Sequence, residues 1–84
     1  MIMSELQNLV SDAEVFEAFQ NTNFGETPNR FIIADTLLKL ACVYHTGRTA
    51  TIICIELGLV RNGSYNLTKK GKEYMFHAFK ISDK

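Results

Sequence analysis

The fold is decided by the C-terminal stretch TATIICIELGLVRNGSYNLTKKGKEYMFHAF, residues 49–79. At its centre, Asn62 and Gly63 separate two short runs that suit β-strands. Asn-Gly is a strong local signal for a β-hairpin, because a type I′ turn needs positive φ at both central residues. The sequence therefore predicts a two-stranded hairpin in which Val60 pairs with Tyr65.

Helices are predicted on both sides of this turn. Thr49 is a suitable N-cap for a helix over residues 50–57, and Gly58 is a suitable residue to end it. The isoleucines of that segment would also suit a strand, but the flanking threonine and glycine favour a helix. Thr68 is the expected N-cap of a last helix over residues 69–79.

The N-terminal part of the chain carries a clear signal for the start of a helix. Ser11 followed by Glu14 forms a capping box, in which the serine oxygen and the glutamate side chain each satisfy a free backbone N–H group. This box predicts a helix over residues 11–20. A short helical stretch over residues 5–10 either precedes this helix or is continuous with it.

The best-defined helix lies in the middle of the chain. Thr27 can act as its N-cap and Pro28 as its first residue, where the missing N–H group costs nothing. Gly47 is expected to end it. Apolar residues recur at spacings of three and four and predict its buried face: Phe31, Ala34, Leu37, Leu38, Ala41 and Cys42.

Two motifs around the Asn-Gly turn resemble a known family. ELGLV (56–60), a short basic turn and YNLTKKGKEYM (65–75) are similar to the wing region of winged helix-turn-helix proteins of the MarR and PadR kind. The resemblance covers residues 49–79 and implies a mainly α fold with a two-stranded β-hairpin, winged helix-turn-helix-like, in one small domain over residues 1–84. It also implies a DNA-binding transcriptional regulator, with a groove-reading pair of threonines and a polar wing tip: Thr49, Thr51, Arg61, Asn62 and Ser64.

Charge is divided unevenly along the chain. Nine Lys and Arg balance nine Asp and Glu among 84 residues, so the formal net charge is zero. Residues 1–42 nevertheless carry a net charge of −4, and residues 43–84 one of +4. The zero total argues against strong non-specific binding of nucleic acid, whereas the basic half suits phosphate contacts.

Basic residues near the start of the last predicted helix are candidates for such contacts. The helix macrodipole disfavours lysines at that end, and a bound phosphate group would explain their presence. Solvated lysines that only add solubility are the alternative. The candidate phosphate contacts are Arg48, Arg61, Lys69, Lys70 and Lys72.

A protein partner is the competing hypothesis. Neutral net charge and an acidic N-terminal half suit a phage or mobile-element accessory protein that binds and inhibits a host protein. The small core also leads us to expect a homodimer, because N-terminal helices often form the dimer in small winged-helix proteins. The candidate interface residues, for a dimer or another partner, are Leu6, Leu9, Val10, Phe16 and Phe19. Packing of the same apolar residues on the central helix is the alternative.

No combination of residues predicts catalysis or metal binding. Cys42, His45, Cys54 and His77 lack the paired spacing of zinc ligands, and the two thiols are expected to be buried and free. Neither a nucleophile next to a base nor a phosphate-binding glycine loop is recognisable. We therefore expect a protein that is not an enzyme and uses no cofactor or metal.

The N-terminal sequence MIMSE lacks the basic and apolar segments of a secretory signal. No apolar run approaches the ~20 residues that a membrane span needs. These features predict a cytoplasmic protein that is not embedded in a membrane.

Overall fold

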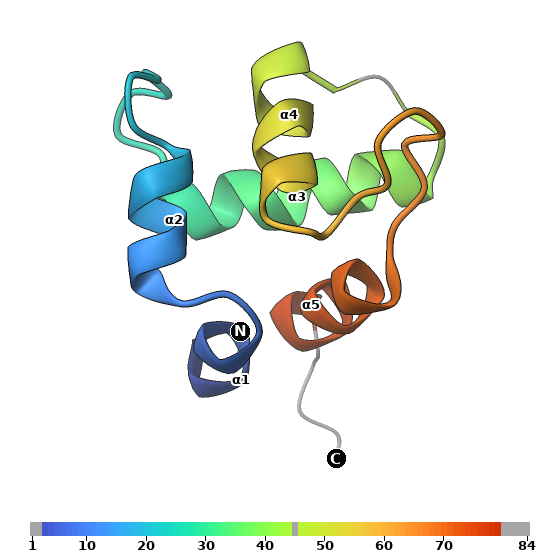
Figure 1. Ribbon diagram of the computed structural model, residues 1–84, viewed down its shortest axis with the longest axis horizontal. Coiled ribbons are helices and arrows are strands. Elements are labelled where there is room, and N and C mark those ends of the chain that lie inside the picture. Colours follow the sequence, from blue (N-terminus) through green and yellow to red (C-terminus); the bar gives the residue numbers. More distant parts are fainter. Residues whose placement is uncertain (1–2, 45, 80–84) are drawn as a thin grey trace.

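Helix α3 runs through the middle of the structure (Figure 1). The computed structural model describes residues 3–44 and 46–79. α5 packs against both α1 and α3, and α4 packs against α3. The helices, in chain order, are α1 (Met3–Leu9), α2 (Asp12–Ala18), α3 (Asn29–Ala41), α4 (Arg48–Glu56) and α5 (Lys69–Phe79).

One hydrophobic core draws on all five helices. Leu6 of α1, Ile33 and Leu37 of α3 and Tyr74 of α5 are completely buried in it, and Leu59 joins them from the segment after α4. Complete burial of an aliphatic side chain contributes about 1.5–3 kcal/mol. The core therefore holds the short N-terminal helix against the last one, although these helices lie at opposite ends of the chain.

Two of the predicted helix starts are confirmed. Ser11 Oγ accepts a hydrogen bond from the backbone N–H of Glu14 at 3.1 Å, and the Ser11 N–H donates to the Glu14 carboxylate at 2.9 Å. The hydrogen bond from the Ser11 backbone N–H, followed by the interaction with the Ser11 side chain, lowers the pKa of the Glu14 carboxyl. Thr68 Oγ1 accepts from the N–H of Gly71 at 3.0 Å and donates to the carbonyl of Gly58 at 2.7 Å, so it joins the start of α5 to the end of α4.

The ends of α3 differ from the prediction. The helix begins at Asn29 with Pro28 as its N-cap, one residue later than expected. It ends at Ala41 in a Schellman motif, in which the Tyr44 N–H donates to the carbonyl of Lys39 at 2.7 Å.

The residue after the α3 C-cap is Val43, whose φ of 60° is left-handed. Valine is unusual at that position, which glycine normally occupies. Gly47 lies further along the chain, where it is the N-cap of α4 in place of the expected Thr49.

The predicted two-stranded β-hairpin is wrong, and with it the winged-helix architecture. The described residues contain no β-strand, only a single antiparallel bridge between Val60 and Leu67. The N–H of Tyr65 donates to the Arg61 carbonyl at 3.1 Å, which closes a wider turn than Asn-Gly alone would make. A type I′ turn would need a positive φ at both Asn62 and Gly63. In this loop the residues with a positive φ are Gly63 and Tyr65, so no type I′ turn forms.

The predicted buried face of α3 is also partly wrong. Phe31 and Leu38 are exposed, whereas Ile33 is completely buried. α3 is apolar on two sides, so spacing alone did not select the face that packs. Arg30 selects it, because its guanidinium reaches inward to the hydroxyl of Tyr74. Two further residues of the predicted face are exposed: Ala41 and Cys42.

None of the helices in the described part of the chain is long and apolar enough to cross a lipid bilayer.

Candidate functional site

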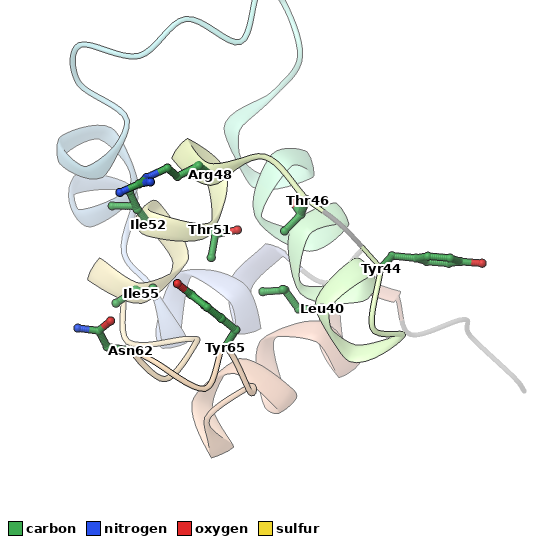
Figure 2. A pocket seen from close by; sticks show the side chains of 9 residues that line it. All are labelled: Leu40, Tyr44, Thr46, Arg48, Thr51, Ile52, Ile55, Asn62 and Tyr65. Carbon is green, nitrogen blue, oxygen red and sulfur yellow. The ribbon is translucent and has the colours of Figure 1, made fainter.

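An open groove of about 490 Å³ lies beside α4 (Figure 2). It is bounded by the C-terminal end of α3, the segment that leads into α4, the outer side of α4 and the loop over residues 61–66. We call it the α4 groove. Its lining residues are Leu40, Tyr44, Thr46, Arg48, Thr51, Ile52, Ile55, Asn62 and Tyr65.

The α4 side of the groove is mainly apolar. Ile52 is 43% exposed on the middle of the helix, and Ile55 is half-buried one turn further on. Thr51 is buried, and its hydroxyl donates to the carbonyl of Gly47 at 3.0 Å. Arg48, the first residue of α4, is exposed. Of the α4 side chains that line the groove, it is therefore the only one that offers a hydrogen-bond donor to a ligand.

The loop side of the groove presents an aromatic ring. Tyr65 is 52% exposed, and Figure 2 shows its side chain reaching from the loop toward α4. The Arg61 N–H donates to the carbonyl of Asn66 at 2.8 Å, and the Val60–Leu67 bridge closes the base of the loop. Tyr44 stands at the other edge, 71% exposed, and points away from the groove (Figure 2).

The charge of the α4 groove is positive. Among the described residues that line the groove, Arg48 is the only charged one and none carries a carboxylate. Arg61 is exposed in the loop next to Asn62, which adds a second cation close to the rim. The groove therefore suits an anionic partner with flat, apolar parts.

A second hollow of about 440 Å³ has the opposite charge. Glu14 and Glu17 of α2 line it together with Glu56, the last residue of α4. The acidic residues of the two halves of the chain thus meet at the C-terminal end of α4, whereas Arg48 lies at its N-terminal end. The acidic hollow draws on both halves of the chain and has Lys70 nearby, so the difference in charge between the halves does not divide the folded protein into an acidic and a basic face.

The nucleic-acid residues predicted from the sequence do not all lie together. Arg48, Thr51 and Asn62 line the same groove. Three others are exposed but lie outside its lining: Thr49, Arg61 and Ser64. Lys70 on α5 lies near enough to Glu14 of α2 to help lower the pKa of the Glu14 carboxyl. Lys69 and Lys72 are exposed on the first turns of α5. Sequence reasoning did not select Ile52, Tyr44 and Tyr65, although exposed tyrosines near loops are a recognisable signal of binding surfaces.

The residues predicted for a dimer or partner interface are mostly internal. Leu6 and Val10 are completely buried and Phe19 is nearly so, because α1 and α2 pack onto the rest of the chain. Leu9 is half-buried against the same core. Phe16 is the member of this set with a large free surface, at 68% exposure.

The two cysteines have different surroundings. Cys54 is buried as expected, and this burial raises the pKa of its thiol to about 12. The same expectation is wrong for Cys42, which is exposed just after α3. Among the residues that the structure describes, which exclude His45, no group of three His, Cys, Asp or Glu side chains could hold a metal ion.

Comparison with known proteins adds no relative: no protein-family model, curated protein or solved structure matches the chain.

Proposed function

We propose that this protein is a small, non-enzymatic DNA-binding protein of the cytoplasm that contacts DNA through the α4 groove. The observation that carries the proposal is the lining of the groove, which combines Arg48, Asn62 and an exposed Tyr65 and contains no carboxylate. Arg and Asn are the side chains that most often contact phosphates and base edges, and aromatic rings contact bases by stacking.

The charge distribution supports weak rather than tight binding. The zero net charge limits long-range attraction to a polyanion, whereas Arg48 and Arg61 give the groove side a local positive potential. Each phosphate that a cation neutralises releases counterions, so affinity falls as salt rises. With two cations on the groove side, we therefore expect affinity that falls roughly tenfold between about 50 and about 200 mM salt.

Fluorescence anisotropy with labelled DNA tests the proposal. Wild-type protein is titrated into single-stranded and duplex DNA of the same sequence, at about 50 and about 200 mM salt. Arg48→Ala should weaken binding several-fold and make it less dependent on salt. Lys39→Ala is the matched control, because it also removes one cation from a residue outside the groove, paired with Asp35 on α3. Absence of binding to either form at low salt would exclude the function.

The α5 lysines remain a second set of candidate phosphate contacts. Lys69 and Lys72 are exposed, so a DNA strand that leaves the groove toward α5 would meet them. If they contact phosphates, the double variant Lys69→Ala with Lys72→Ala lowers the slope of log K against log salt by about two. An unchanged slope would confine the contacts to the α4 groove.

Protein binding is the second candidate function, and the outer face of α3 favours it. Phe31 and Leu38 are exposed two turns apart, so two large apolar side chains lie on the same side of this helix. Sedimentation of the wild-type protein and of the double variant Phe31→Ser, Leu38→Ser tests whether the protein self-associates through this face. A monomer at all concentrations excludes the homodimer. Capture from a host lysate that the same substitutions abolish would support a different partner.

A further inference from the structure

We infer that the α4 groove binds single-stranded DNA in preference to duplex, with a base stacked on Tyr65 and the neighbouring phosphate at Arg48. This inference rests on the proposed function and names the form of DNA that the groove takes. It follows from what the groove offers to a ligand and from what it lacks.

The helix that borders the groove, α4, carries few groups that read a duplex. A helix in the major groove recognises bases through hydrogen bonds to their edges, made by side chains such as Arg, Asn and Gln. On the groove side of α4, Ile52 and Ile55 have no polar atoms, and the Thr51 hydroxyl is occupied by the Gly47 carbonyl. Only Arg48 is left to form such a contact from this helix.

The groove offers surfaces that suit the flat faces of bases instead. The ring of Tyr65 and the side chain of Ile52 are both about half-exposed on it. In a duplex the base faces are covered by stacking, so these two side chains would meet only edges and backbone. In a single strand the faces are free, and aromatic side chains bind them with little regard to sequence.

The backbone fixes the position of the Tyr65 ring. Tyr65 has a φ of 61°, a left-handed conformation that is unfavourable for a bulky residue. Its N–H is held by the Arg61 carbonyl at 3.1 Å, and the Val60–Leu67 bridge anchors both ends of the loop. Strained residues of this kind gather at binding sites, where the surrounding structure maintains them. Here the residue with the positive φ carries an aromatic ring that is 52% exposed in the groove lining.

The start of α4 supplies the phosphate contact. The macrodipole disfavours a cation at a helix N-terminus, yet Arg48 is the first residue of α4, and its N-cap Gly47 provides no side-chain hydrogen bond. A phosphate at this end would pair with the guanidinium and accept from free backbone N–H groups. Arg61, next to Asn62 in the loop, would meet a following phosphate. The size of the groove, about 490 Å³, lies in the range of sites for small organic ligands and leaves room for a base between α4 and the loop.

Anisotropy titrations with one labelled strand of roughly 12 nucleotides, alone and annealed to its complement, test the inference at about 50 mM salt. Wild-type protein should bind the single strand about tenfold more tightly than the duplex. Tyr65→Asn removes the ring but tolerates a left-handed φ, so the loop keeps its shape. It should weaken single-strand binding by about 5–150-fold, the range for loss of one stacked base. Tyr65→Phe keeps the ring and should stay within about twofold of wild type.

The outcomes separate the inference from the proposed function. Equal affinity for both forms, or tighter binding of the duplex, would overturn the inference and leave DNA binding intact. Preference for the single strand that Tyr65→Asn does not reduce would also overturn it, because the base would then lie elsewhere. Failure to bind either form would exclude both. Circular dichroism of each variant checks that the helices are unchanged, and Tyr65→Phe serves as the folded reference.

Discussion

Arg30 on α3 donates a hydrogen bond from Nη1 to the hydroxyl of Tyr74 on α5 at 3.2 Å, within the core. Its Nη2 donates to the carbonyl of Val10 at 2.8 Å and to Asp12 Oδ1 at 2.7 Å. Burial disfavours the charge of Arg30, but the hydrogen bonds to Asp12 and Tyr74 outweigh this effect and hold its pKa above the ordinary value. One side chain thus joins α3, α5 and the junction between α1 and α2.

Loss of this guanidinium should destabilise the protein strongly. Arg30→Met leaves the buried Tyr74 hydroxyl and the Val10 carbonyl without their partner, and we expect a loss of about 3 kcal/mol in the free energy of unfolding. Urea denaturation followed by circular dichroism measures it. The control is Lys39→Met, which breaks an ion pair with Asp35 that is largely solvated and should change stability by less than about 0.5 kcal/mol. Equal effects of the two substitutions would contradict the role assigned to Arg30.

A methyl group at Gly71 should disrupt the contact between α5 and the end of α4. A Cβ at this position would overlap the backbone carbonyl of Leu59, which has no rotamer by which to move away. We expect Gly71→Ala to cost about 3 kcal/mol, because overpacked sites force backbone shifts. Gly47→Ala is the matched control, since a Cβ there has nothing within 4 Å and the φ is −63°. Thermal denaturation of the two variants should differ by several degrees or more.

Stability should fall at alkaline pH because of Cys54. Burial raises the pKa of this thiol from 9.0 to about 12, so the folded protein keeps its proton over a range in which the unfolded chain releases it. The stabilisation is complete below pH 9 and is lost as pH rises toward 12, by about 1.4 kcal/mol for each unit. Denaturation midpoints at several pH values measure the slope. Cys54→Ala should lower stability at neutral pH but flatten the alkaline slope, while Tyr74, whose pKa burial also raises, keeps part of it. An alkaline slope unchanged in Cys54→Ala would be inconsistent with this account.

The two thiols should differ sharply in reactivity. Cys42 is exposed and Cys54 is buried, so a thiol reagent should modify Cys42 in the native protein at once and Cys54 only upon unfolding. Titration in buffer and then in urea, followed by absorbance, counts them. The variant Cys42→Ser should show no rapid reaction. A rapid reaction that persists in this variant would mean that Cys54 is reached in the native state.

Local signals in the sequence predicted much of the fold, and long-range contacts explain what they missed. The capping box of Ser11 with Glu14 and the cap at Thr68 are confirmed, because their partners lie three residues away. The buried face of α3 depends on Arg30, whose partner Tyr74 is 44 positions distant. No local spacing reveals that pair.

The loop over residues 61–66 shows the same limit at the candidate site. Asn-Gly is a real turn signal, and the chain does reverse direction there. The residues with a left-handed φ are Gly63 and Tyr65, however, and Val60 pairs with Leu67. The sequence therefore indicated Arg48 and Asn62 as candidates and could not show that Tyr65 lines the same groove.

The charges at the two ends of α4 have a consequence for its dynamics. Arg48 begins and Glu56 ends a helix of nine residues, so both charges oppose the macrodipole, and no side chain caps the first turn. A helix this short is marginal by itself, so α4 depends on its contact with α3 and should open before the core between α1, α3 and α5 does. Its amide protons should exchange with solvent faster than those of α3. A ligand in the α4 groove would slow that exchange, since the groove exists only while α4 is folded.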